Sequence, residues 1–183
     1  VGNPEPLFAY DPNGYASLNT MYNIVVIDQE YDEKYVLAVL NSKWVKNYWL
    51  ANFSDNKKLF PKIKGFQLKV IPIPKTSLSE QEILIKKAEL MLKLNQTFYE
   101  KKSKFFNRIS KHFGLNKLNK RLLLFYALSF NEFIEEIEGL SKNKLSLKEQ
   151  DDWEDYFNEY KKEMLSLKQD IEKTDKEIDD MVY

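Results

Sequence analysis

The sequence predicts an α+β fold in two parts, a small mixed α/β unit over residues 1–74 and a long-helix hairpin or helical bundle over residues 75–183. Two observations support this prediction. Residues 21–27 form a β-branched and aromatic run between polar residues, which is typical of a buried strand. After Pro74 the apolar residues recur at spacings of three and four, the period of an amphipathic helix. With 43% apolar residues among 183, the chain can bury one sizeable core or two small ones.

The first unit is predicted to contain one helix between two strands. Apolar residues at spacings of three and four over residues 34–50 indicate the helix. Residues 67–73 alternate towards a pair of prolines, Pro72 and Pro74, which have no N–H group to donate and therefore end the second strand.

The second unit is predicted to be helical throughout. Three Ser-x-x-Glu patterns, at residues 79–82, 129–132 and 146–149, are capping boxes that mark helix starts. Gly114 and Gly139 are expected to end the first two of these helices.

The last helix carries the most regular pattern of the chain. Apolar residues are spaced alternately by four and three, which is a heptad seam of about four repeats with one polar break, and such a seam requires a partner helix. The helix that starts near Ser79 has a double apolar stripe and is the natural candidate for an antiparallel pairing within the chain. The seam consists of Trp153, Phe157, Tyr160, Met164, Leu167, Ile171, Thr174, Ile178 and Met181.

Charge is distributed unevenly, although the whole chain has a net charge of zero. Residues 1–74 carry a net +1, residues 75–130 a net +8 and residues 131–183 a net −9. Pairing of the basic and acidic segments explains this division, and it is favoured over separate surfaces for separate partners.

The chain has no cysteine and no apolar run long enough to span a bilayer. These features predict a cytoplasmic protein that does not insert into a membrane. Because the chain begins at Val1 without an initiator Met or a leader pattern, we expect it to be a fragment of a longer protein.

The sequence contains few of the residues and motifs that catalysis requires. His112 is the single histidine, and its place near a predicted helix end indicates a charge at the helix C-terminus rather than a general base. The sequence contains no Gly-rich phosphate loop and no spaced set of metal ligands. We therefore expect no enzymatic activity, no cofactor and no metal site in this chain.

Binding is better supported. Residues 43–69 contain seven lysines against one acidic residue, Asp55, with aromatic residues between them. Lysines attract phosphates, and polar tips such as those of Asn52 and Asn56 are able to contact bases. The alternative is that the aromatic residues belong to a core and the lysines to an ordinary solvated rim.

A set of short motifs resembles one known family. Residues 35–43 end in Leu-Asn-Ser-Lys, residues 59–64 contain Phe-Pro-Lys-Ile-Lys, and residues 71–74 read Ile-Pro-Ile-Pro. In this order they resemble the TaqI-like C-terminal specificity domain of type II restriction-modification DNA methyltransferases. The Glu-Gln helix start within residues 79–81 and the Ile-Asp-x-x-Val-Tyr-like end at residues 176–183 continue the resemblance.

This resemblance implies a DNA target-recognition domain that positions an adenine for a methyltransferase domain elsewhere in the parent polypeptide. The Asn-Pro-Pro-Tyr type motif of such a methyltransferase is absent from the chain. Double-stranded DNA and the methyltransferase domain are the expected partners. Base readers are expected among Asn52, Asn56 and residues 15–19. The candidate DNA-binding residues are Lys43, Lys46, Asn52, Asn56, Lys57, Lys58, Lys62 and Lys64.

An alternative function remains open at this point. The chain could be a coiled-coil interaction or scaffold protein without DNA binding, which would form homo-oligomers through the heptad seam.

Overall fold

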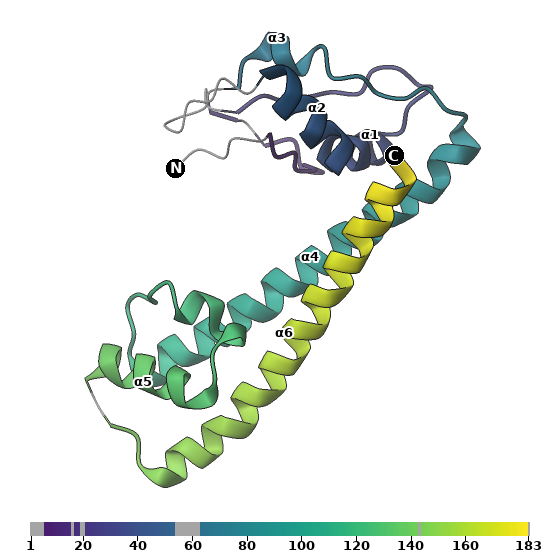
Figure 1. Ribbon diagram of the computed structural model, residues 1–183. Helices are drawn as coiled ribbons and strands as arrows, with labels where there is room; N and C mark the ends of the chain where they lie inside the picture. The colour runs from purple at the N-terminus through teal and green to yellow at the C-terminus, as the bar shows by residue number, and fades with distance from the viewer. Residues whose placement is uncertain (1–5, 16, 19–20, 54–62, 143, 183) are drawn as a thin grey trace. The chain divides into compact units, whose positions relative to one another are not determined.

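The computed structural model describes residues 6–15, 17–18, 21–53, 63–142 and 144–182. The helices of these residues are, in chain order, α1 (Glu33–Asn41), α2 (Lys43–Phe53), α3 (Gly65–Leu68), α4 (Leu78–Phe113), the 3₁₀ helix η1 (Leu122–Ala127), α5 (Phe130–Ser141) and α6 (Leu147–Val182) (Figure 1). Two compact units share the long helices. Unit 1 comprises Val1–Leu92 with Lys173–Tyr183, and unit 2 comprises Lys93–Glu172.

The predicted α+β class is wrong, because the described residues form helices and no strand. Residues 21–27 are extended, but only Val26 packs against the core of unit 1, while Val25 and Ile27 are 75% and 88% exposed. A strand requires a neighbouring backbone to complete its hydrogen-bond ladder, and none of the described segments supplies one here. The second predicted strand, residues 67–73, overlaps helix α3 instead.

Ser42 divides the predicted helix 34–50 into two helices. This buried residue has an extended backbone, with φ −66° and ψ 156°. Its hydroxyl donates to the carbonyl of Val39 at 2.7 Å, and its oxygen lies 3.4 Å from the backbone nitrogen of Val45, which donates to it. One side chain therefore satisfies backbone groups at the end of α1 and at the start of α2, which makes the break tolerable inside the core.

Two of the three predicted capping boxes are confirmed, at Ser129 and Ser146, and the third is displaced. Helix α4 is capped by Ser77, whose Oγ accepts from the backbone N–H of Glu80 at 3.3 Å while the Glu80 carboxylate accepts from the Ser77 backbone at 2.8 Å. The predicted box at residues 79–82 is wrong. Its glutamate, Glu82, forms an ion pair with Lys86 one turn further on instead.

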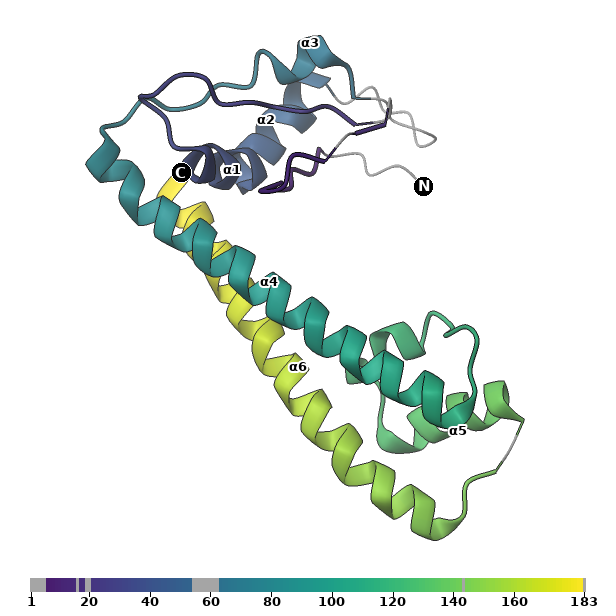
Figure 2. The same ribbon diagram turned by 180° about the vertical axis from the view of Figure 1, so that it is seen from behind.

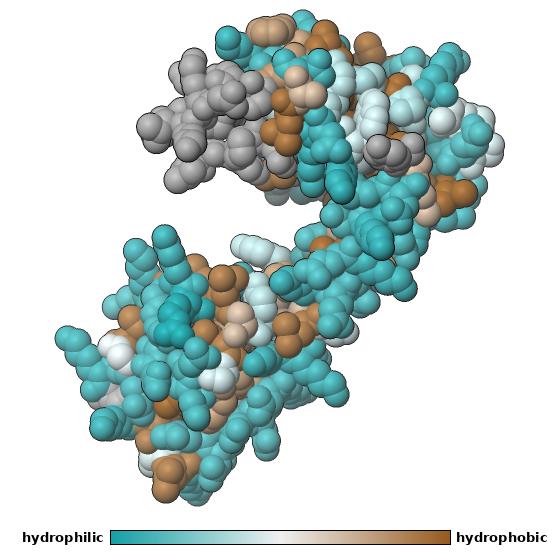
Figure 3. Space-filling view, in the orientation of Figure 1, coloured by the Kyte–Doolittle hydropathy of each residue, from teal (hydrophilic) through white to brown (hydrophobic). Residues whose placement is uncertain are grey.

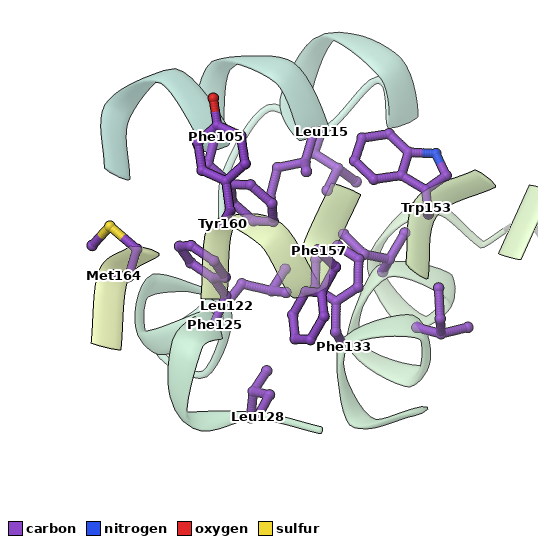
Figure 4. Close-up of a cluster of buried hydrophobic side chains, with 13 residues drawn as sticks. Phe105, Leu115, Leu122, Phe125, Leu128, Phe133, Trp153, Phe157, Tyr160 and Met164 are labelled. Carbon is purple, nitrogen blue, oxygen red and sulfur yellow. The ribbon is translucent and has the colours of Figure 1, made fainter. Parts of the chain in front are cut away.

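The core of unit 2 is a cluster of aromatic side chains from α4, η1, α5 and α6. The Phe105 ring of α4 stacks on Phe125 of η1 with centroids 3.9 Å apart. Phe157 of α6 and Phe133 of α5 lie side by side at the centre of the cluster, with centroids 4.8 Å apart (Figure 4). The predicted burial of the first part of the seam is therefore confirmed, and α5 and η1 cover it together with α4.

The core of unit 1 joins α1 and α2 to the beginning of α4 and the end of α6. Val39 and Trp49 are buried in the same cluster as Leu84, Ala88 and Ile178. Both ribbon views show α4 and α6 side by side here (Figures 1 and 2). The sequence prediction assigned these helix ends to the second part of the chain, and the predicted domain boundary itself stays a prediction.

All of the described seam residues except Met181 are buried or half-buried within the chain. Of the nine, Trp153, Phe157, Tyr160, Met164, Thr174 and Ile178 are buried, Leu167 and Ile171 are half-buried, and Met181 is exposed. In the space-filling view, hydrophilic residues cover most of the visible surface of α4 and α6 (Figure 3). None of the described helices is both long and apolar enough to cross a membrane.

Candidate nucleic-acid interface

The motif residue Asn41 has a framework role. Its side-chain amide pairs with the backbone of Phe8: Oδ1 accepts from the Phe8 N–H at 3.1 Å, and Nδ2 donates to the Phe8 carbonyl at 3.0 Å. Nδ2 also donates to the carbonyl of Leu37 within α1. Asn41 therefore holds the segment around Phe8 against α1, next to the break that Ser42 creates.

The motif residue Gln81 has a similar role and is completely buried. Its Nε2 donates to the carbonyls of Glu30 at 2.7 Å and Thr76 at 3.2 Å, and its Oε1 accepts from the N–H of Asp32 at 3.0 Å. Asp32 in turn caps α1 by accepting from the backbone N–H of Lys34 at 2.7 Å. Gln81 thus fixes the start of α4 against the start of α1.

The candidate lysines of α2 lie at its first turn, close to a carboxylate. The exposed Lys43 is the first residue of α2, and its backbone N–H donates to Asp179 Oδ1 of α6 at 2.6 Å. Lys46, one turn further on, is half-buried. Because Asp179 already occupies the positive end of α2, a phosphate would meet a like charge there.

Asn52 lies near the opposite end of α2, about 14 Å from Lys43 along the helix axis. It is exposed, and its Nδ2 donates to the carbonyl of Tyr48 in the preceding turn at 2.8 Å. The hydroxyl of Tyr48 donates to the carbonyl of Val70 at 3.1 Å, which ties α2 to the segment after α3.

Lys64 and two aromatic residues form an exposed group, which we call the Lys64 patch and define as Tyr22, Lys64 and Phe66. The Lys64 ammonium lies 5.9 Å from the centroid of the Phe66 ring, and Phe66 is 61% exposed. The Tyr22 hydroxyl donates to the carbonyl of Ile63 at 3.2 Å. A Cβ at Gly65 would lie 3.3 Å from the Tyr22 ring, so glycine permits this close approach. A cation beside exposed aromatic faces is suited to phosphates and stacked bases.

Sequence reasoning did not include Tyr22 among the binding residues, and it counted Phe66 only as one of the aromatic residues between the lysines. Tyr22 was assigned to a buried strand, although it is 54% exposed. The signal that points to Phe66 is its place directly after Lys64-Gly65, where an aromatic residue follows a cation and a permissive backbone position.

The structure does not bring the described candidates to one place, because Lys43 and Lys46 lie at one end of α2, and Asn52 at the other. Asn56, Lys57, Lys58 and Lys62 lie outside the described residues. In the segment 15–19, Tyr15 is 72% exposed, and its hydroxyl oxygen lies 3.4 Å from Asn13 Nδ2, which donates to it. The full set of candidate DNA-binding residues stays a prediction.

The pKa shifts of unit 1 arise at structural contacts. A hydrogen bond of 2.6 Å to Glu89 raises the pKa of Lys34. A hydrogen bond from Lys87 lowers the pKa of Glu177 where α4 meets α6. Burial raises the pKa of Tyr35.

No group of three or more potential metal ligands occurs among the described residues. The exposed His112 ring packs edge-on against Phe113 and Trp153, with centroids 4.7 and 5.0 Å apart. These contacts give His112 a packing role at the end of α4.

The described part of the chain is a helical framework, held together by buried polar residues such as Gln81, with exposed cations and aromatic residues on its surface. Residues 77–182 match the Domain of unknown function (DUF8810), and since this match spans more than half of the chain, the chain belongs to that family. Residues 1–73 match the TaqI-like C-terminal specificity domain, which confirms the resemblance inferred from the motifs. The motifs at residues 79–81 and 176–183 lie outside that second match.

The specificity domain gives residues 1–73 a restriction-modification specificity role, and such a domain is not itself catalytic. In general, DNA and a methyltransferase are the partners of a specificity domain. No curated protein and no solved structure matched the chain.

Proposed function

We propose that residues 1–73 recognise duplex DNA by its sequence and position a target adenine for a methyltransferase domain of the parent polypeptide. The observation that carries this proposal is the match of residues 1–73 to the TaqI-like C-terminal specificity domain. Within this segment, the side chain of Asn41 is used for backbone hydrogen bonds, so recognition falls to exposed residues.

Within this function, Lys64 is the strongest described candidate for phosphate contact. It is exposed, it makes no ion pair among the described residues, and Phe66 offers a face on which a sugar or an unpaired base can stack. It also lies two residues after Lys62, so it extends the candidate group at residues 57–62. Lys43 is weaker, because Asp179 lies beside its helix end.

The experiment measures binding of the full chain to a labelled duplex by fluorescence anisotropy over a series of salt concentrations. Lys64→Gln is compared with Lys86→Gln, which removes the same charge from an exposed position on α4. We expect Lys64→Gln to weaken binding to every duplex and to flatten the slope of log K against log salt by about 0.9, with a much smaller effect for Lys86→Gln.

Sequence recognition requires a second measurement. The chain is used to select duplexes from a random library, and we expect enrichment of one short sequence over the starting pool. Absence of salt-sensitive DNA binding would overturn the proposed function, and binding without enrichment would reduce it to nonspecific phosphate attraction.

A further inference from the structure

Unit 2 contains a long segment without an acidic residue. Residues 101–131 hold eight lysines and arginines and no aspartate or glutamate. This segment covers the second half of α4, η1 and the connections around it. Such a run creates a positive surface unless acidic residues from other elements neutralise it.

Acidic residues of unit 2 neutralise only some of these cations. Lys101 pairs with Glu163 of α6 at 2.8 Å, and Arg121 pairs with Glu132 and Glu136 of α5 at 2.9 and 2.6 Å. Lys102 lies over the rings of Phe106 and Tyr126. The cations that are exposed and make no ion pair among the described residues are Lys104, Arg108, Lys111, Lys117 and Lys120.

Three of these cations share one face of α4, and we call Lys104, Arg108 and Lys111 the α4 stripe. Spacings of four and three place them in a row on one side of the helix, whereas the neighbouring Phe105 and Ile109 are buried in the core. Arg108 lies close enough to α6 for its charge to act on Tyr156. Over seven residues the row extends about 10 Å along the helix.

Two ordinary explanations do not account for the stripe. Stabilisation of the helix C-terminus applies to Lys111, which lies in the last turn, but Lys104 and Arg108 lie further from the end. Pairing of the basic segment with the acidic α6 was favoured by the sequence, but between α4 and α6 of unit 2 the described ion pair uses Lys101.

We propose that the α4 stripe binds the phosphate backbone of duplex DNA and forms a sequence-independent contact surface in addition to the candidates in residues 1–73. One strand of B-DNA presents one phosphate per about 3.4 Å of helix axis, so a row of about 10 Å meets roughly three phosphates. The row has three exposed cations, so it matches that number of phosphates. The choice of DNA as the partner rests on the proposed function, since an acidic protein would be attracted by the same charges.

The test compares two triple variants of the full chain. Lys104→Gln/Arg108→Gln/Lys111→Gln removes the stripe, and Lys148→Gln/Lys162→Gln/Lys168→Gln removes three charges from exposed positions of α6 in the same unit. Circular dichroism and thermal melting establish that both variants are folded. Binding is measured by anisotropy over a salt series with a 30-base-pair duplex and, in parallel, with polyglutamate.

We expect the stripe variant to flatten the salt slope for DNA by roughly 2 to 3, and the α6 variant to leave it nearly unchanged. Equal losses in both variants would show an effect of net charge alone and overturn the proposal. An unchanged DNA affinity of the stripe variant would also overturn it, including the case in which only polyglutamate binding falls.

The Lys64→Gln variant separates this proposal from the proposed function. If Lys64→Gln weakens DNA binding and the stripe variant does not, the stripe proposal fails and the proposed function stands. If the stripe variant alone weakens binding, the stripe proposal stands and the recognition surface is not at Lys64. If the unaltered chain does not bind DNA, both fail.

Discussion

Gln81 Oε1 accepts a hydrogen bond of 3.0 Å from the backbone N–H of Asp32, a residue 49 positions earlier in the chain. The same side chain donates to the carbonyl of Glu30, so it fixes the backbone on both sides of Tyr31. A buried amide with all of its groups paired makes the start of α4 and the start of α1 one unit. Glu30 and Asp32 lie within the match to the specificity domain, and Gln81 lies within the match to DUF8810, so these hydrogen bonds join the two matched segments.

Replacement of Gln81 should therefore destabilise the chain. Gln81→Ala leaves the N–H of Asp32 and the carbonyl of Glu30 without a partner, and we expect the free energy of unfolding to fall by about 2 to 3 kcal/mol. This free energy is measured by urea unfolding, with circular dichroism as the signal. The matched control is Gln96→Ala on the exposed face of α4, which should change the stability by less than about 0.5 kcal/mol. Equal effects of the two variants would contradict the framework role of Gln81.

The aromatic core of unit 2 should be sensitive to truncation at its centre. Phe157 is fully buried beside Phe133, and Phe157→Ala should lower the free energy of unfolding by roughly 3 to 5 kcal/mol because it leaves a cavity. Phe66→Ala is the same substitution at an exposed position, and it should lower the free energy of unfolding only slightly. An unchanged melting temperature of Phe157→Ala would show that the seam is not packed as described.

The capping boxes should make stability depend on pH in the acid range. Hydrogen bonds from the Ser146 side chain and backbone lower the pKa of Glu149 from its ordinary 4.5. A lowered pKa in the folded chain means that the carboxylate stabilises it above the ordinary pKa, and that this contribution is lost as the pH falls through the folded pKa.

Glu149→Gln tests this expectation, because glutamine keeps the capping geometry and removes the charge. The stability difference between Glu149→Gln and the unaltered chain should be present at pH 7 and should shrink between pH 4.5 and lower values. Glu154→Gln, at an exposed position on the same helix, serves as the control in urea unfolding at each pH. A difference that is independent of pH would refute the role of the carboxylate.

The lysines at residues 57 and 58 should contribute to DNA affinity. If four to six lysines contact phosphates, the slope of log K against log salt should be roughly −4 to −5, with affinity on the order of 10⁻⁴ to 10⁻⁶ M at physiological salt. Lys57→Glu/Lys58→Glu should weaken binding to all sequences and flatten the slope by about two, whereas Lys173→Glu/Lys176→Glu on α6 should do little. Equal losses of DNA affinity in both double variants would show that the lysines act only through the net charge of the chain.

Several features of the fold follow from short stretches of sequence. The capping boxes at Ser129 and Ser146 were predictable because each involves residues within one turn. The burial of Phe157 followed from the period of the seam, and the resemblance of residues 1–73 followed from motif order. The lysine-rich segment around Lys64 was visible from composition alone.

Other features depend on contacts between distant residues. A single residue, Ser42, ends one helix and begins another because its hydroxyl fits inside the core, which the helical period of residues 34–50 does not reveal. The exposure of Tyr22 and Phe66 is likewise set by their neighbours in space. The contacts of Gln81 cross 49 residues, so no local pattern indicates them.

The sequence by itself determined the helix starts at Ser129 and Ser146, the period of the seam and the resemblance of residues 1–73 to the specificity domain, since each rests on interactions between near neighbours or on the order of motifs. Only the tertiary structure decided that the described part of the chain contains no sheet. Residues 21–27 have the composition of a strand, but a strand also needs a second backbone beside it, and the described segments offer none. Whether β-branched residues form a strand is therefore decided by their partner in space rather than by their own preference.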